Sequence, residues 1–494
     1  MKILKKYKDL LLIFLTSFLL FYRSLFVFFT NDDFFHFITS RAYTFKDFLN
    51  FFNLVAPVTG FPNYRPFATQ VIYFLDWKFF NLNPLPMHIF LFALFFGTIY
   101  LVYKISQYLI SGHQSPTTNH ASLIAAFLYS VSATHFGQLY FVATQEIIYG
   151  FFFLLTVWLF IKYLGEGKLR FLAYSFLTFL LTLASKEPAV TLPFVLGLVY
   201  LFFKWQGKTK VGTREITLIL SPFLIILAGY LYMRFFHYGF AKGDSYLWAF
   251  EPKRILNSLA WYGLWSLNIP EMLVDFVGPG LKFLPSLFKH YSKEIIPIFV
   301  LFSMQLALLI YGAIKGFLFK SKKSAITHYP LTIAVFSTAW FTGTLVPVLF
   351  LPIHKFSFYL TVPLFGVVLF ISYLLINLKS KIINLLFITV WVSLSVLTLN
   401  LTGKVSWITR GEETAGRAYQ YFSENEAEFS GKRIILVDTP KDTELPWSPT
   451  ETVKVVLSNQ DFFTVFFPDK FEVKYDIEGK GEGIKVESRQ FLGY

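Results

Sequence analysis

The chain has 494 residues, of which 55% are hydrophobic, 20% aromatic and only 15% charged, and its formal net charge is +14. Soluble domains carry about 25% charged residues, so this composition predicts an integral membrane protein. The absence of cysteine excludes disulfides, thiolate metal sites and cysteine nucleophiles. The basic residues fall in short loops between apolar runs, which is typical of membrane orientation and not of nucleic-acid binding.

The first apolar run, residues 10–29, is long enough to cross a bilayer as one helix. Lysines precede it and no small-residue cleavage site follows, so we expect a retained helix with the N-terminus in the cytoplasm. Asp32 and Asp33 follow where the chain leaves the membrane. A charge inside a bilayer costs about 2.5–3.5 kcal/mol on insertion scales, so acids at this boundary need a reason. They are either a polar helix cap or a catalytic carboxylate at the lipid surface.

Residues 31–84 hold no clean 20-residue apolar run. We expect an external loop with amphipathic helices on the membrane surface, the Phe side chains and Trp77 facing lipid. A mixed region at 237–293 includes 253–275, which could be a surface helix or a re-entrant one. Further crossings are predicted near residues 85–110, 120–137, 147–164, 169–184, 188–204, 215–236, 294–319, 328–350, 358–377 and 381–401.

The charges between these runs predict the orientation. Alternating sides from a cytoplasmic N-terminus places only short basic loops in the cytoplasm, as the positive-inside rule requires. These loops carry Lys162, Lys168, Arg170, Lys204, Lys208, Lys210, Arg214, Lys315, Lys320, Lys322, Lys323, Lys379 and Lys381. The sequence therefore predicts about eleven transmembrane helices in residues 1–402, with an external C-terminus.

Residues 403–494 differ in composition, with 12 Lys and Arg against 16 Asp and Glu. Helical spacing covers 414–429, and 433–437 and 453–457 read as short strands. Residues 471–477 and 483–487 alternate like edge strands. We expect a small extracytoplasmic α+β domain, and the fold class as a whole is an all-α polytopic membrane protein with that addition. This part shows no nucleotide loop or metal-ligand spacing, which favours recognition or packing over chemistry.

The predicted topology brings polar groups from four turns to the external face. Each has an ordinary explanation: Lys186 with Glu187 as a self-neutralising turn, Arg65 reaching lipid phosphates, Glu146 capping a helix, and the histidines and Lys355 as interfacial anchors. Together they predict a polar site above a hydrophobic body. The candidates are Asp32, Asp33, His36, Tyr64, Arg65, His135, Gln138, Gln145, Glu146, Lys186, Glu187, His354, Lys355 and Tyr359.

The order of these motifs resembles the polytopic glycosyltransferases of the GT-C class that use polyprenyl-phosphate sugars. The nearest resemblance is to protein O-mannosyltransferases of the branch that carries tetratricopeptide repeats, and to their bacterial relatives. It covers roughly residues 10–400, and the repeats themselves are missing. The matching segments are Asn31-Asp32-Asp33, Tyr64-Arg65-Pro66-Phe67, Asn83 to His88, His135, Ser185 to Pro193, and His354 to Pro363. Gly137 and Gln145 stand where that branch has Glu and Arg, which implies a different donor or acceptor.

The resemblance implies sugar transfer from a polyprenyl phosphate to a hydroxyl of a protein, glycan or lipid acceptor, at the extracytoplasmic face of a cell membrane. Such transfer needs a base for the acceptor proton, for which Asp32 is the first candidate and Asp33 the second. Cations must meet the leaving phosphate, and Arg65, Lys186 and Lys355 are the candidates. Direct displacement implies inversion at the anomeric carbon. The Phe- and Lys-rich composition without cysteine suggests a bacterial source.

A divalent metal, Mg or Mn, could be held by Asp32, Asp33, Glu146 and His135, although their spacing does not demand one. Two other classes stay open. A transporter would carry charges in mid-helix, and Arg234, near the external end of its crossing, is the exception to otherwise nearly charge-free interiors. A non-catalytic lipid-binding membrane protein would explain the interfacial residues equally well.

Overall fold

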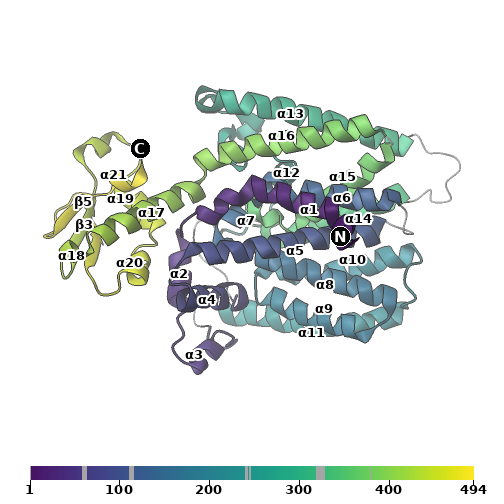
Figure 1. Cartoon of the computed structure of the whole chain (residues 1–494), viewed down its shortest axis with the longest axis horizontal. Coiled ribbons are helices and arrows are strands. Elements are labelled where there is room, and N and C mark those ends of the chain that lie inside the picture. The colour runs from purple at the N-terminus through teal and green to yellow at the C-terminus, as the bar shows by residue number, and fades with distance from the viewer. Residues whose placement is uncertain are drawn as a thin grey trace.

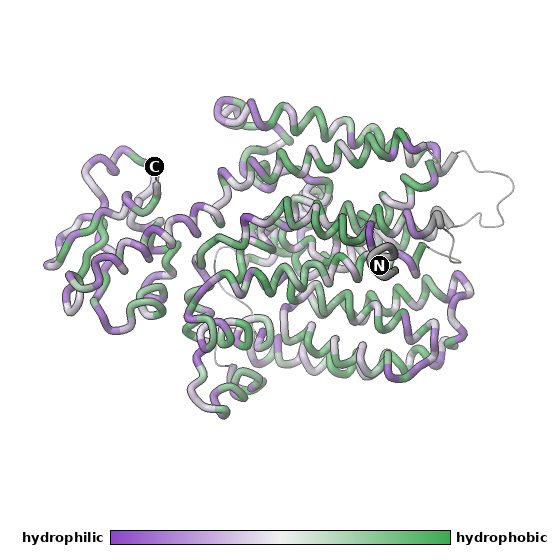
Figure 2. Tube along the Cα trace, in the orientation of Figure 1, coloured by the Kyte–Doolittle hydropathy of each residue, from purple (hydrophilic) through white to green (hydrophobic). Residues whose placement is uncertain are grey.

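Long helices running side by side make up most of the chain, and a smaller mixed unit sits at one end of them (Figure 1). The computed structural model describes residues 2–57, 64–110, 116–239, 243, 246–318, 329–378 and 380–493. Lys320, Lys322, Lys323 and Lys379, which the orientation argument used, lie outside these residues. Hydropathy separates the two parts, since the bundle is mainly apolar and the C-terminal unit is mixed (Figure 2).

A helix lies at each predicted crossing. Eight helical segments of the described chain are long and apolar enough to span a membrane, which agrees with a multi-pass membrane protein. Three others, α6, α9 and α15, are only 15 or 16 residues long. The helices of the bundle are α1 (Lys2–Phe21), α5 (Pro84–Ile110), α6 (Pro116–Ser130), α8 (Glu146–Glu166), α9 (Leu169–Leu183), α10 (Leu192–Trp205), α11 (Thr213–Met233), α13 (Pro285–Leu318), α14 (Tyr329–Leu349), α15 (Pro363–Leu378) and α16 (Lys381–Val405).

Helix α8 lies at the centre of the bundle, against α5 and α9. It begins with Glu146, an acid in the first turn where the helix dipole favours negative charge. It ends at Gly167, whose φ of +69° suits a glycine C-cap. Gly150 allows close approach, because a Cβ there would overlap the Thr361 side chain. The start of α8 is therefore packed directly against the chain that enters α15.

The first loop folds into short helices: α2 (Asp32–Thr39), α3 (Phe45–Asn50), the π-helical turn η2 (Phe67–Val71) and α4 (Ile72–Phe79). The helices were predicted, but the exposure of their Phe side chains was wrong in part. Phe34 and Phe37 are fully buried. Their rings pack within the protein, Phe34 on Phe462 and Phe37 on Tyr73, while Trp77 is half-buried. Tertiary packing covers a face that the sequence assigned to lipid.

The region between α11 and α13 contains α12 (Pro252–Ser266), the turn η8 (Glu271–Phe276) and a two-residue hairpin, β1 (Val277–Gly278) with β2 (Lys282–Phe283). The side chains of Trp261, Tyr262 and Trp265 are buried. Asn268 follows α12 and accepts hydrogen bonds from Ser132 Oγ and the Ala133 amide, both at 2.9 Å. Helix α12 is therefore fixed to the body of the bundle.

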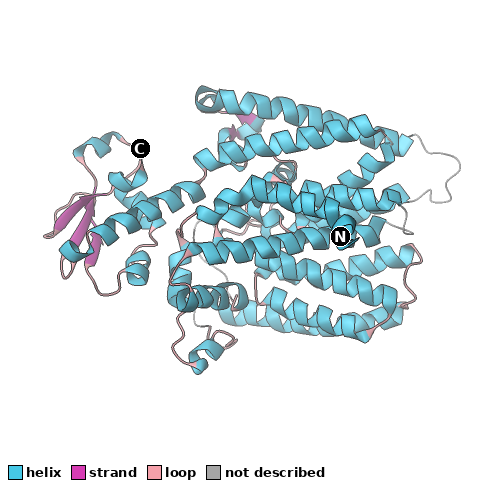
Figure 3. Cartoon of the chain, in the orientation of Figure 1, coloured by secondary structure: helices cyan, strands magenta, loops and turns pink. Residues whose placement is uncertain are grey.

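The C-terminal unit has a three-stranded sheet, which Figure 3 shows at the end of the molecule. Strand β3 is central and pairs in parallel with both neighbours, Ile435 opposite Lys474 and Lys485. The strand predicted at 433–437 is present with those bounds, and the strands predicted at 471–477 and 483–487 are present in shorter form. The elements are α17 (Trp407–Glu424), α18 (Glu426–Phe429), β3 (Arg433–Val437), η11 (Pro440–Glu444), α19 (Pro449–Val456), α20 (Asp461–Phe466), β4 (Glu472–Tyr475), β5 (Ile484–Glu487) and α21 (Arg489–Leu492).

The strand predicted at 453–457 is wrong, because residues 453–456 belong to α19 and Leu457 is its C-cap. Ser448 caps that helix by accepting a hydrogen bond from the Glu451 amide at 3.1 Å, and Pro449 occupies its first position. These start signals outweigh the β propensity of the valines. Val453 is fully buried, so the helix packs one valine inward.

The C-terminal unit is joined to the bundle without a linker and docks on α2. Ser406 ends α16 and caps α17 by accepting from the Ile408 amide at 3.2 Å. The Asn31 amide donates to the Val456 carbonyl at 2.9 Å, and Arg41 Nη2 donates to the Thr464 carbonyl at 2.9 Å. The unit therefore covers the helix that begins with Asp32.

Candidate functional site

Arg65 joins three of the predicted external turns. Its guanidinium pairs with Glu187, with Nε at 3.0 Å from Oε1 and Nη2 at 2.6 Å from Oε2. Nη1 donates to Gln145 Oε1 at 2.8 Å, and Gln145 Nε2 donates to His36 Nε2 at 3.2 Å. Gln145 adopts a left-handed conformation with φ of +54°, which turns the chain just before α8. The segments around residues 36, 65, 145 and 187 therefore meet at one end of the bundle.

His36 is neutral in this setting. Burial, together with the nearby Arg65 charge, lowers the pKa of His36 to about 3. A neutral imidazole can accept the hydrogen bond from Gln145. His36 therefore acts as an acceptor that orients the Gln145 amide toward Arg65.

The two aspartates have different environments. Asp33 is buried, and its carboxylate accepts from the Tyr73 hydroxyl and, at 2.9 Å, from the Thr30 amide. Burial raises the pKa of Asp33 to about 7, and these hydrogen bonds oppose the rise. Asp32 is exposed, yet protein surrounds it on most sides. This desolvation raises the pKa of Asp32, and the Arg65 charge opposes it. Solvent therefore reaches Asp32 but not Asp33.

Lys186 and Glu146 form a buried ion pair. Nζ lies 2.8 Å from Glu146 Oε1, and the two side chains are 5% and 1% exposed. The ammonium also donates to the Thr144 carbonyl and lies 5.0 Å from the centre of the Tyr359 ring. Burial lowers the pKa of Lys186, whereas Glu146 raises it. Lys186 therefore ties the start of α8 to the turn at 357–360.

The turn before α15 contributes mainly aromatic side chains to this end of the bundle. His354 packs on Tyr246 with centroids 4.3 Å apart, and also contacts Tyr359. Burial, then the charges of Lys186 and Arg65, lowers the pKa of His354 to about 4. Lys355 points elsewhere, and its Nζ donates to Asn257 Oδ1 of α12 at 3.0 Å.

Three of the predicted site residues, His135, Gln138 and Tyr64, make contacts within the protein that stabilise the fold. His135 is fully buried and both ring nitrogens are engaged, Nδ1 with Gln138 Oε1 and Nε2 with the Tyr129 carbonyl, each at 2.7 Å. Gln138 donates to the Phe358 carbonyl at 2.9 Å. Tyr64 lies beside Arg65 in the chain but stacks on Tyr238 and donates to the Phe52 carbonyl. The structure does not direct these side chains at Asp32.

The proposed metal ligands are not gathered into one set. Within the described ranges, no three His, Asp or Glu side chains lie close enough together to hold a metal ion. The nitrogens of His135 are already used, and Glu146 is paired with Lys186.

Four residues near this end were not singled out as site candidates. Tyr73 binds Asp33, Tyr246 lies within electrostatic reach of Arg65 and Asp32, and Glu412 lies within reach of Asp33. Arg234 acts on Glu187. Arg234 could have been found from its place at a helix end. Glu412 could not, because it stands among other charges in a polar helix far along the chain.

No protein-family model matches the chain, and no curated protein matches it. The arrangement itself is chemically specific. A solvent-reachable carboxylate lies near a guanidinium that is held in place by two partners, at one end of an apolar bundle. Such a site can accept a proton beside a fixed positive charge.

Proposed function

We propose that the protein is an integral membrane glycosyltransferase that moves a sugar from a polyprenyl-phosphate donor to a hydroxyl acceptor. The observation that carries the proposal is the placement of the exposed Asp32 carboxylate within electrostatic reach of Arg65. Both lie at the end of the apolar bundle where the segments around residues 36, 65, 145 and 187 meet. A lipid-linked donor keeps its tail among apolar helices and its phosphate at such a boundary, so no nucleotide-binding domain is required.

In the proposed reaction, Asp32 accepts the proton of the acceptor hydroxyl as its oxygen bonds to the anomeric carbon. The bond between that carbon and the phosphate oxygen breaks, and the electron pair leaves with the polyprenyl phosphate. The sugar passes through an oxocarbenium-like state, and attack opposite the leaving group inverts the anomeric configuration. Asp33 is the less suitable base, because Tyr73 and Thr30 already occupy its oxygens.

Among the three proposed phosphate ligands, Arg65 is the best supported. Its side chain is 19% exposed, whereas Lys186 is almost fully buried and Lys355 is bound to Asn257. A guanidinium also presents donors in a planar fork that suits phosphate oxygens. The Glu187 pair fixes its orientation, so little rearrangement is needed when charge develops on the phosphate.

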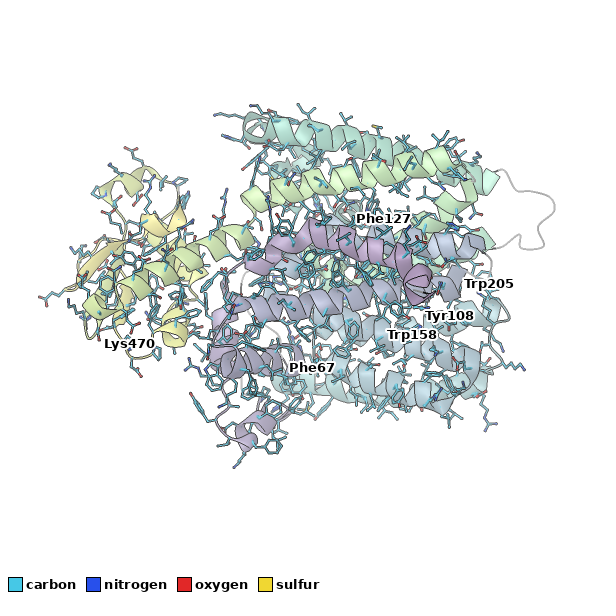
Figure 4. All side chains as sticks on the ribbon, viewed as in Figure 1. Phe67, Tyr108, Phe127, Trp158, Trp205 and Lys470 are labelled. Carbon is cyan, nitrogen blue, oxygen red and sulfur yellow. The ribbon has the colours of Figure 1, made fainter. Side chains whose placement is uncertain are left out.

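The membrane topology belongs to the same proposal. Eleven crossings from a cytoplasmic N-terminus would place the Asp32 end and residues 403–494 outside a bacterial plasma membrane. Tyr108 and Trp205 lie at the end of the bundle opposite to Lys470 (Figure 4). Lys208, from a predicted cytoplasmic loop, donates to the Tyr108 carbonyl at 3.1 Å. Basic residues in short loops at that end are typical of a cytoplasmic interface.

The test is sugar transfer by purified protein with a panel of polyprenyl-phosphate sugars and hydroxyl acceptors. General-base catalysis contributes about 10²–10⁴-fold, so Asp32→Asn should lower the transfer rate by that factor. Glu166→Gln, at the predicted cytoplasmic end, is the matched control and should keep the wild-type rate. Full transfer by Asp32→Asn would remove the proposed base. Solute movement into sealed vesicles without any transfer would instead favour a transporter.

A further inference from the structure

We propose that the C-terminal segment, residues 407–493, is required for activity at this site because it positions α2, the helix that carries Asp32. The inference rests on the proposed function and extends it. Recognition or packing was expected of this segment, whereas the contacts described here give it a defined role in the chemistry. Its positioning residues are Gly411 and Glu412 of α17.

The first support is the position of the docking contacts on α2. The Asn31 amide, one residue before Asp32, donates to the Val456 carbonyl at 2.9 Å. Asn31 has a φ of +50°, an uncommon conformation for a residue with a side chain, so its geometry depends on such partners. Phe34, one turn later, packs its ring on Phe462 with centroids 5.2 Å apart. Residues on both sides of Asp32 are therefore held by the C-terminal segment.

The second support is the close approach of α17 to the turn before α2. A Cβ at Gly411 would lie 2.5 Å from Thr30 Oγ1 and 3.1 Å from Asn31 Oδ1. Only glycine leaves room for this approach. The Thr30 amide in turn donates to Asp33 Oδ2, and Asp33 accepts from Tyr73. A displacement at α17 is therefore passed directly to the aspartate pair.

The third support is a buried carboxyl group that nothing in the proposed reaction uses. Glu412 is 3% exposed, and its Oε1 has no hydrogen-bond partner. Burial raises the pKa of Glu412 well above its usual value, and Asp33 and Glu413 add to the rise. Tyr140, the last residue of the short helix α7 (Phe136–Tyr140), lies within electrostatic reach of both Glu412 and Arg23. A neutral Glu412 avoids charge repulsion with the nearby Asp33, whereas an ionised Glu412 would repel it.

The main experiment compares two glycines on the same helix in the full-length protein. Gly411→Ala inserts a methyl group against Thr30. Gly416→Ala meets only Phe28 Cβ at 3.7 Å, an ordinary contact, and is the matched control. Misplacing a reacting group by about 1 Å can cost on the order of 100-fold in rate. We expect Gly411→Ala to lower kcat by roughly 10- to 100-fold with an unchanged donor KM, and Gly416→Ala to keep the wild-type kcat.

A rescue variant separates positioning from simple loss of folding. Thr30→Ala removes the oxygen that the new methyl group would meet, so the Gly411→Ala/Thr30→Ala protein should recover most of the lost kcat. Glu412→Gln supplies a group that stays neutral at every pH. It should match wild type near neutral pH and keep its activity at alkaline pH, where ionisation of Glu412 lowers the wild-type rate.

Hydrogen exchange of α2 amides gives a readout that does not need activity. Gly411→Ala should speed exchange in α2 and leave α5 unchanged. If wild-type protein transfers no sugar, the proposed function fails, and faster α2 exchange still supports the positioning contact. If wild-type protein transfers sugar while Gly411→Ala keeps both its kcat and its α2 exchange, the positioning role alone is overturned.

Discussion

Glu146→Gln should destabilise the protein strongly, because it leaves the Lys186 charge buried without its partner. The two side chains are 5% and 1% exposed, so solvent screens the pair little. Breaking a buried ion pair from one side costs about 3–5 kcal/mol. The remaining contacts of Lys186, the Thr144 carbonyl and the faces of two aromatic rings, carry no full negative charge to replace the carboxylate.

The assay is thermal unfolding in detergent, in which the loss of the monodisperse gel-filtration peak reports the unfolded fraction at each temperature. Glu166→Gln is the matched control, because the Lys168–Glu166 pair is 54% and 34% exposed and such surface pairs contribute about 0–1 kcal/mol. Equal Tm values for Glu146→Gln and Glu166→Gln would refute the reasoning that Lys186 is held as a buried charge.

Removing both charges separates the two roles considered for Lys186. A Glu146→Gln/Lys186→Met protein has no buried charge at this place, and replacement of a buried pair by uncharged groups is often neutral. We expect its Tm to return close to the wild-type value. If Lys186 serves only to join α8 to the turn at 357–360, sugar transfer should return with it. Transfer that stays absent in a stable double variant would show a direct contact with the donor.

Three further predictions concern the same end of the bundle and its packing. Burial raises the pKa of Asp33 to about 7, above the roughly 3.9 of an unfolded chain, so the native state binds the proton more tightly and stability falls as pH rises through that window. Asp33→Asn should flatten the dependence of Tm on pH between about 4 and 7; an unchanged slope would contradict it. Arg65→Lys keeps the positive charge but loses the two-point contact with Glu187. We expect the KM for the donor to rise by an amount that corresponds to roughly 1.5–3 kcal/mol of lost charged hydrogen bonding, which initial rates against donor concentration would measure. Gly150→Ala should lower the free energy of unfolding by about 1–3 kcal/mol, because its methyl group overlaps the Thr361 side chain. Gly197→Ala has open space around the new methyl group and should leave the free energy of unfolding unchanged. Equal Tm values for the two variants would argue against the close approach at Gly150.

The positions of the helices followed from apolar periodicity, because long apolar runs have few other solutions in a membrane protein. The sequence could also indicate that Arg65 and Glu187 share one face, since the long first loop and the short turn at 185–188 are both predicted to be external. It could not separate Asp32 from Asp33, because exposure depends on Tyr73 and on a C-terminal segment that is distant in the chain. The helix α19 was missed for a local reason, as its valines favour a strand and only the Ser448–Pro449 start favours a helix.

The order of motifs in the sequence placed Lys355 and His135 near the site but did not predict where their side chains point. Both lie in the expected segments, yet the direction of a side chain depends on neighbours from other elements. Asn257 of α12 holds Lys355, and the Tyr129 carbonyl and Gln138 hold His135. Asn257 could not be inferred from the segment that contains Lys355, whereas both partners of His135 lie within six residues of it.

The contact between Asn31 and the carbonyl of Val456 joins residues separated by 425 positions in the chain. During synthesis α2 emerges early, whereas α19 and α20 are made last. Chains that grow from the N-terminus fold in that order. The face of α2 that contacts the C-terminal segment therefore stays exposed while the remaining helices insert. Phe34 and its neighbours are exposed throughout that interval, which makes the nascent protein dependent on protection outside the membrane. Truncation near the C-terminus would leave that apolar surface permanently open, so quality-control proteases should recognise shortened chains even when every crossing has been completed.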